Sequence, residues 1–269
     1  MTLIELKSVS GTCGAGEVRD VSFRLPNGKT YGVFSPFYAD AVALLALMGG
    51  ARTPTGGAIF AGGFDLHREA KQARHGIGYL PSGLLPDDAL TPIEYLMAVA
   101  DVRELPYDKT LRHVHELLEI ADLADKKERL IAHLSQGEKR ALCLLQVVLG
   151  KPEILILTSP LSGLTPKEAQ KIRELICYFG DTYTIFVGTP ATQDLCEMCD
   201  EILVLQNGVL KAVLQANDES LVQKFTHTPT KPSSATESKP PKKSTRWKML
   251  MQSSGEYEVL DSDEQEDKS

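Results

Sequence analysis

Residues 134–140 read Leu-Ser-Gln-Gly-Glu-Lys-Arg, and a mostly apolar run follows from 141 to 149. A serine with a glutamate three positions later, here Ser135 and Glu138, is typical of a capping box, in which each side chain accepts a hydrogen bond from the other residue's backbone amide. The pattern therefore predicts a helix over residues 135–149. Such a helix start also carries the positive end of the helix dipole, which attracts anions.

Strand and helix patterns alternate on both sides of this motif. Short, fully apolar runs predict buried strands, and apolar residues that recur every three or four positions predict helices. The predicted strands are 30–34, 153–157, 183–187 and 202–205, and the predicted helices are 41–48 and 166–179. Strands that alternate with helices are typical of an α/β fold with a parallel sheet covered on both faces.

Two further regions flank this core. Near the start, residues 3–9 and 18–25 alternate polar and apolar side chains, and Pro26-Asn27-Gly28 supplies a turn, so we expect a β-rich opening. Residues 92–123 show helical spacing with an interruption near Pro106, which predicts a small all-helical lobe.

The composition excludes several classes of protein. With 269 residues, 42% of them hydrophobic, the chain is long enough to bury a sizeable core in one folded unit. Its net charge of −7 argues against nucleic-acid binding, which needs a basic surface to neutralise phosphates. No apolar run approaches the roughly 20 residues that cross a bilayer, and residues 1–10 lack a signal-peptide core, so we expect a cytoplasmic protein.

The five cysteines are scattered and form no disulfide framework, so we expect reduced thiols. Cys196 and Cys199 have the spacing of half a zinc site. No second pair of cysteines or histidines follows them, and we therefore expect no metal site in the chain.

The composition changes sharply after Phe225. Residues 226–269 are rich in Pro, Ser, Thr, Lys and acidic residues without an apolar period, which predicts a disordered tail. Within this tail, residues 239–248 are basic and include Trp247, whereas residues 256–267 are strongly acidic. The basic run is either a solvated segment or a contact with anionic lipid.

The motif at 134–140 resembles the signature motif of ABC-transporter ATPases, and it stands where that family has it, after a helical lobe and before a buried strand. The resemblance covers the folded part of the chain and implies an ABC ATPase-like domain at residues 1–225. It implies a P-loop NTPase-like (RecA-like), mostly parallel sheet core, an N-terminal antiparallel β-subdomain and a helical lobe inserted at 83–145. In style the chain is similar to ATP-binding subunits of bacterial multidrug-type exporters, whose membrane domains are separate chains.

In that family the start of the signature helix faces the γ-phosphate of an ATP molecule held by the opposite subunit. The resemblance therefore implies that this chain contacts MgATP at a composite site held by a partner, through Ser135, Gln136, Gly137 and Glu138. The capping box alone also explains the serine and the glutamate, so both interpretations remain open.

The family's own phosphate-binding loop, of the form GxxxxGK[ST], is degenerate in residues 35–42. Ser35 and Asp40 replace its two glycines. Ala41 replaces the lysine that reaches the phosphates, and Val42 replaces the hydroxyl that coordinates magnesium. The resemblance thus implies that these four positions do not bind a nucleotide.

Two further features of this loop bear on nucleotide binding. Asp40 brings a carboxylate to the helix start where phosphates would lie, and we expect it to cap the helix in their place. The bulky pair Phe37 and Tyr38 either fills the emptied cleft or forms an ordinary surface of an altered loop.

The positions that hydrolyse ATP in the family are also replaced. Thr158 stands in place of the magnesium-linked aspartate, and Ser159 stands in place of the glutamate base, whose proton affinity a serine hydroxyl lacks. Ser82 and Pro190 replace the family's Gln or Glu sensor and its switch histidine. Thr165 replaces an aspartate that links the two sites of a dimer. We therefore expect no catalytic residue, no bound metal and no nucleotide in the chain's own site.

The surviving motif serves a partner's nucleotide in the family, whereas the lost motifs serve the chain's own. This contrast favours a non-hydrolysing half of a heterodimeric ABC ATPase, paired with an active ABC ATPase subunit. The alternatives are a pseudo-ATPase adaptor or regulatory protein outside transport, and an active ATPase with unorthodox residues.

The family also receives a helix of its transmembrane permease subunit in a groove that matches residues 84–95. The exposed apolar set expected there is Leu84, Leu85, Leu90 and Ile93. These residues equally suit the core of the helical lobe. The resemblance implies a position in the cytoplasm, peripheral to the inner face of the cell membrane.

Overall fold

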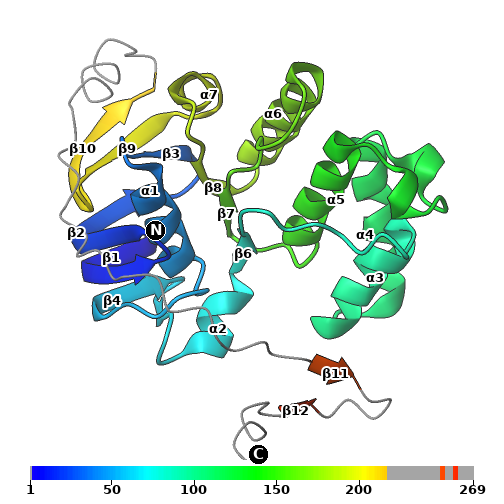
Figure 1. The fold of residues 1–269 in the computed structure, drawn as a ribbon, viewed down its shortest axis with the longest axis horizontal. Helices are drawn as coiled ribbons and strands as arrows, with labels where there is room; N and C mark the ends of the chain where they lie inside the picture. The colour runs from blue at the N-terminus through cyan, green and yellow to red at the C-terminus, as the bar shows by residue number, and fades with distance from the viewer. Residues whose placement is uncertain (1, 217–248, 252–256, 260–269) are drawn as a thin grey trace, which may run out of the picture. The chain divides into compact units, whose positions relative to one another are not determined.

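The computed structural model describes residues 2–216, 249–251 and 257–259 (Figure 1). Contacts divide the chain into two units, Met1–Lys231 and Pro232–Ser269. In the described part of the second unit, β11 (Met249–Met251) pairs with β12 (Tyr257–Val259) in antiparallel fashion. No element is predicted for this stretch from the sequence, because three-residue strands are too short to show a period. The rest of the predicted tail lies outside the described residues.

The first unit opens with an antiparallel sheet in the order β2-β1-β4-β5. Its strands are β1 (Thr2–Cys13), β2 (Gly16–Pro26), β4 (Gly56–Ala61) and β5 (Phe64–Asp65). The first two strands were predicted. The second two were missed, because glycines interrupt the short apolar alternation at 56–63.

A second sheet has the order β10-β9-β3-β8-β7-β6. Its strands are β3 (Thr30–Phe34), β6 (Ile77–Leu80), β7 (Ile154–Thr158), β8 (Thr184–Gly188), β9 (Glu201–Gln206) and β10 (Val209–Gln215). All pairs are parallel except that of β9 with β10. Every residue of β3, β7 and β8 is buried, which explains their continuous apolar sequences.

Helix α1 (Tyr38–Met48) packs against strands of both sheets and buries its residues 43–48 between them. The other helices beside the parallel sheet are α2 (Ala70–His75), α6 (Pro166–Gly180) and α7 (Thr192–Met198). Because α1 follows β3 directly, its first turn lies at the carboxyl edge of the parallel sheet, where loops of neighbouring strands meet.

The helical lobe contains α3 (Pro92–Val102), α4 (Tyr107–Ile120) and α5 (Gln136–Val148), grouped beyond β6 in Figure 1. Two short 3₁₀ turns, Ala124–Lys126 and Ile131–His133, connect α4 to α5. The structure thus confirms the predicted P-loop NTPase-like α/β fold, with its antiparallel β-subdomain and its helical lobe. No helix within the described ranges is long and apolar enough to cross a bilayer.

Candidate functional site

The loop after β3 does not cap α1 with Asp40. The helix begins at Tyr38, and the residue before it, Phe37, makes no side-chain cap. The buried Asp40 carboxylate instead accepts hydrogen bonds from the backbone amides of Glu17, at 3.0 Å, and Gly208, at 3.1 Å. The predicted capping role is therefore wrong: this side chain connects α1 to β2 and to the turn between β9 and β10.

The reason for this difference is tertiary. The start of β2 crosses so near to α1 that a Cβ atom on Gly16 would lie 1.8 Å from the Ala39 carbonyl oxygen. This approach brings the Glu17 amide within reach of the Asp40 carboxylate, away from the helix amides. Burial raises the pKa of Asp40, although its two backbone hydrogen bonds oppose the shift.

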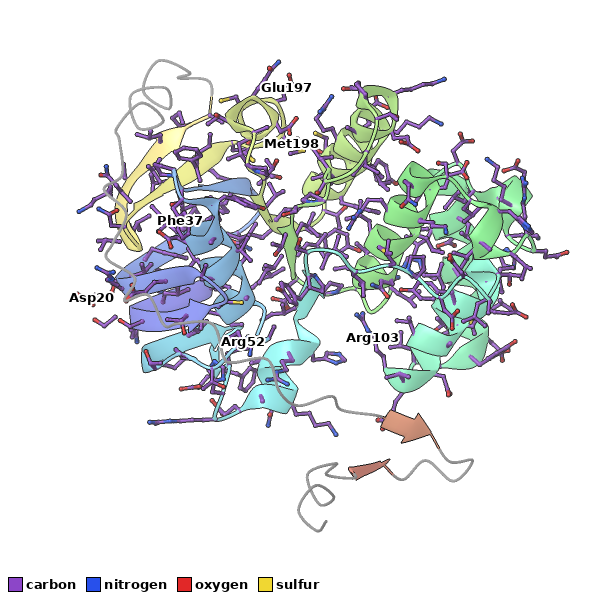
Figure 2. The ribbon with its side chains drawn as sticks, in the orientation of Figure 1. Asp20, Phe37, Arg52, Arg103, Glu197 and Met198 are labelled. Carbon is purple, nitrogen blue, oxygen red and sulfur yellow. The ribbon has the colours of Figure 1, made fainter. Side chains whose placement is uncertain are left out.

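Tyr38 points inward at the same helix start. Its hydroxyl donates to the Gly188 carbonyl at 2.9 Å and lies 2.7 Å from the Ser159 hydroxyl, which must then act as the donor to it. Burial raises the pKa of the Tyr38 phenol, and the hydrogen bond with Ser159 opposes that rise. Phe37 is 49% exposed (Figure 2), so only one of the two bulky side chains enters the interior.

The ends of β7 and β8 supply the remaining contacts. Thr158 is buried at the end of β7, and the buried Ser159 that follows has a left-handed backbone with φ of 51°. The Ser159 amide also donates to the Gly188 carbonyl, at 2.8 Å. A Cβ atom on Gly188 would lie 2.5 Å from a Leu45 methyl group, so the glycine allows α1 to pack this closely.

The structure separates the predicted positions into two groups. Ser35, Asp40, Ala41, Thr158 and Ser159 are buried, and Val42 is half-buried. Ser82 and Pro190 are exposed. Within residues 2–216, no three His, Cys, Asp or Glu side chains are arranged to hold a metal ion. The buried group offers hydroxyls and one carboxylate but no cation for a phosphate.

The predicted capping box at the start of α5 is confirmed. The Ser135 hydroxyl accepts from the Glu138 amide at 3.3 Å, and the Glu138 carboxylate accepts from the Ser135 amide at 2.9 Å. Ser135 and Gln136 are exposed, whereas Gly137 is buried. The helix start therefore presents its first two residues to the surroundings and covers the third.

Glu168 covers this third residue, a contact that the sequence analysis missed. Its Oε1 accepts from the Gly137 amide at 2.9 Å. Hydrogen bonds, first of all from the Gly137 and Thr165 amides, lower the pKa of Glu168 to about 2. The sequence did carry half of the signal, because Thr165 and Glu168 have the spacing of a second capping box, which the structure forms on α6.

A cavity of about 640 Å³ lies beside this pair of helix starts, between α5 and α6. Its lining includes Ser135, Gly137, Glu168, Lys171 and Tyr178. The start of α5 is thus reachable from a groove as well as from the surface.

A second cavity, of about 430 Å³, has a basic lining of Lys71, Arg74, His75 and Arg103. Figure 2 shows Arg103 between α2 and the end of α3. The helices α2, α3 and α5 all end at or near this cavity. Arg74 and His75 lie in the last turn of α2 and Arg103 caps the end of α3, where cations offset the partial negative charge of the last carbonyl groups.

The four residues expected to receive a membrane subunit differ in exposure. Leu85 is 61% exposed. The other three, Leu84, Leu90 and Ile93, are partly buried and pack against the core of the helical lobe. Three of the four residues therefore fit the interpretation as core of the helical lobe, and one fits the interpretation as an exposed surface.

Comparison with known proteins identifies the family. A family model described as ABC transporter matches residues 18–162, which is more than half of the chain. The chain therefore belongs to the ABC transporter family, and it has the fold of that family's ATP-binding domain.

Curated relatives agree with this assignment. The linearmycin resistance ATP-binding protein LnrL of Bacillus subtilis (strain 168) is 25% identical over 197 residues, which cover 73% of this chain and 63% of LnrL. The Nod factor export ATP-binding protein I of Rhizobium meliloti is 30% identical over 207 residues, which cover 76% of this chain and 62% of that protein. The chain thus spans less than two thirds of the length of these two relatives.

Solved structures support the fold. A structure of an ATP binding subunit of an ABC transporter matches with a TM-score of 0.68 and 24% identity, covering 84% of this chain and 95% of that one. The structure of cbiO1 from Clostridium perfringens, part of the ABC transporter complex cbiONQ, matches with a TM-score of 0.71 and 19% identity, covering 83% of this chain and 92% of that one.

Proposed function

We propose that this chain is a non-hydrolysing ABC subunit whose own nucleotide site is closed by its own side chains. The observation that carries the proposal is the position of Tyr38, which joins the degenerate phosphate loop to Ser159 and Gly188. The segments that match the family's phosphate and magnesium loops are here connected by hydrogen bonds within the chain. A nucleotide would have to break these bonds without gaining a lysine or a magnesium ligand in return.

The magnitudes favour a large loss of affinity. Charge-assisted hydrogen bonds contribute roughly 1.5–3 kcal/mol each. A change from micromolar to millimolar affinity corresponds to about 4 kcal/mol. The absence of the lysine at Ala41 and the hydroxyl at Val42 is therefore enough to move affinity into the millimolar range. The buried Asp40 carboxylate adds repulsion toward phosphate oxygens.

The proposal extends to a partner. The capped start of α5, with exposed Ser135 and Gln136, has the form of the signature helix that contacts a nucleotide held by another subunit. An intact ABC ATPase chain would supply the phosphate loop, the base and the MgATP, and this chain would complete that site. A transmembrane permease would dock near the exposed Leu85, which places the complex at the inner face of the cell membrane.

A second candidate function is that of an adaptor or regulatory pseudo-ATPase. The observation that favours it is the contact of Glu168 with the Gly137 amide, because this contact occupies a group that the signature helix would offer to a phosphate. Under this alternative, the surface around α5 and α6 recruits a protein and never contacts a nucleotide.

Calorimetric titration of the full chain with MgATP up to several millimolar tests the closed site. We expect no saturable heat of binding. A micromolar dissociation constant would sink the proposal and make an ATPase with unorthodox residues the leading interpretation. As a matched positive control, an intact ABC ATPase chain is titrated under the same conditions.

Substitution of Ser135 separates the two candidate functions. In a reconstituted complex with an active ABC ATPase chain, Ser135→Arg should abolish the stimulated ATPase activity, because the longer side chain blocks the exposed helix start. Ser135→Thr keeps the capping hydroxyl and should retain most of the activity. Unchanged activity in Ser135→Arg would favour the adaptor.

A further inference from the structure

The carboxylate of Glu168 bonds the N-termini of two different helices. Its Oε2 accepts from the Thr165 amide at 3.0 Å and from the Thr165 hydroxyl at 2.8 Å, which caps α6. Its Oε1 accepts from the Gly137 amide of α5 at 2.9 Å. The Gly137 amide of the signature motif is therefore already bound to an anion of the same chain.

Capping alone does not require this second contact. The capping box of α3 uses the same residue types, Thr91 and Glu94, with hydrogen bonds of 2.8–3.3 Å between them. The Glu94 carboxylate bonds Thr91 of its own capping box, whereas the Glu168 carboxylate also reaches across to another helix. The comparison isolates the contact with α5 as a feature beyond helix capping.

The close approach depends on the glycine of the motif. A Cβ atom on Gly137 would lie 2.7 Å from Cγ and 2.8 Å from Cβ of Glu168. Any other residue at this position would push the carboxylate away from the amide. The chain thus combines a glycine and a glutamate that fit each other across two helices.

We propose that Glu168 is an internal substitute for a terminal phosphate, which holds the signature helix closed until a partner's nucleotide displaces it. This inference rests on the proposed function, since it concerns regulation of the same trans-acting site. The Gly137 amide carries one proton and serves one acceptor, and two anions at this helix start repel each other. Contact with a partner's γ-phosphate therefore requires the Glu168 side chain to rotate away.

The surroundings allow this rotation. Glu168 is half-buried and lines the cavity between α5 and α6. Lys171 lines the same cavity one turn further along α6 and forms an exposed ion pair with Asp122 at 3.3 Å, so a displaced carboxylate could share this cation as an i,i+3 neighbour. Displacing the Glu168 carboxylate costs free energy. The start of α5 therefore opens when this chain pairs with a partner that holds a nucleotide, and free nucleotide alone does not open it.

The test uses the full chain without a partner. NMR spectra follow the backbone amides of Gly137 and Glu138 in the wild type, in Glu168→Ala and in Glu168→Gln, while inorganic phosphate is titrated in. We expect the Gly137 amide to exchange with solvent on the order of tenfold faster in Glu168→Ala. We also expect phosphate to shift these two amides saturably in that variant and not in the wild type. Glu94→Ala is the matched control, because it removes an equivalent capping glutamate away from the signature helix.

Two outcomes overturn the inference: an unchanged Gly137 exchange rate in both Glu168 variants, or equal phosphate shifts in the wild type and Glu168→Ala. If Glu168→Ala does not fold, Glu168→Gln replaces it in the test. Its side-chain amide oxygen still accepts a hydrogen bond, so we expect this variant to keep the fold. The proposed function fails separately. If phosphate binds only without the carboxylate, yet Ser135→Arg leaves a reconstituted complex fully active, the internal contact stands and the trans-acting role does not.

Discussion

The Tyr38 hydroxyl lies 2.7 Å from the Ser159 hydroxyl, although 121 residues separate the two along the chain. Tyr38 begins α1 after β3, and Ser159 follows β7. The same phenol reaches the Gly188 carbonyl at the end of β8. One side chain thus connects the start of α1 with the ends of β7 and β8 at the carboxyl edge of the parallel sheet.

Removal of the Tyr38 hydroxyl should destabilise the protein without creating a nucleotide site. Tyr38→Phe leaves the ring in place and deprives the Ser159 hydroxyl of its acceptor, at a cost of about 1–2 kcal/mol in the free energy of unfolding. Urea denaturation measures this loss. Tyr178→Phe, at a residue that is 54% exposed, is the control and should have almost no effect. A loss as small as the control's would show that the hydrogen bond contributes nothing.

Return of the family lysine should harm the fold. Ala41 is fully buried in α1, so Ala41→Lys places an ammonium group among packed apolar side chains. The expected loss exceeds about 3 kcal/mol, because burial of an unpaired charge costs several kcal/mol. Val42→Thr introduces a hydroxyl at a half-buried position and should cost only about 1 kcal/mol, the lower end of the cost of burying a hydroxyl. Thermal denaturation of both variants checks the order, and an Ala41→Lys variant that binds MgATP would contradict our account of this loop.

Loss of the Asp40 carboxylate should leave two backbone amides without acceptors. Each buried amide without a partner costs about 1–3 kcal/mol, so Asp40→Ala should be less stable than Asp40→Asn, which keeps one acceptor oxygen. Burial raises the pKa of Asp40 in the folded protein above the ordinary value of 3.8 that it has in the unfolded chain. The free energy of unfolding should therefore fall as the pH rises from 3.8 through the raised pKa. Asp40→Asn should lack this decline. Urea denaturation from pH 3 to pH 7 measures both effects, with the exposed Asp101→Asn as the control; equal stability of the two Asp40 variants would contradict the hydrogen-bond assignment.

Acid should weaken the contact between α5 and α6. The pKa of Glu168 is lowered from 4.5 to about 2 in the folded protein, so its contribution is complete above pH 4.5 and is lost as pH falls toward 2. Glu168→Gln cannot lose a charge, and its stability should fall less steeply than that of the wild type over this range. Denaturation midpoints between pH 2 and pH 6 provide the measurement. If the wild type and Glu168→Gln lost stability equally steeply as the pH falls, the ionised carboxylate would be ruled out as the stabilising group.

The exposed leucine of the helical lobe should affect assembly and not folding. Leu85→Glu leaves the core intact, because the side chain is 61% exposed, and it should reduce co-purification with a transmembrane subunit. Val102→Glu is the matched control, since that residue is 86% exposed at the end of α3, away from the expected groove. Equal recovery of the membrane partner with both variants would remove Leu85 from the docking surface.

Local patterns in the sequence were sufficient for most elements and for the fold class. The strand at 30–34 and the helix at 166–179 follow from apolar runs and helical spacing, and the structure places them at Thr30–Phe34 and Pro166–Gly180. The capping box of Ser135 and Glu138 was also predictable, because its partners lie three residues apart. Missed elements such as β4 and α2 are short and interrupted by glycine or polar residues, so they show no clear period.

The order of strands and helices and the family motif are therefore predictable from residue types and short spacings alone. The contacts of the Asp40 and Glu168 side chains, in contrast, depend on how the chain folds in three dimensions. Asp40 bonds an amide 168 residues away at Gly208, and Glu168 bonds one 31 residues away at Gly137. Such pairs form because sheet order and helix packing bring distant backbone amides beside a carboxylate, and no local spacing encodes which amide that is.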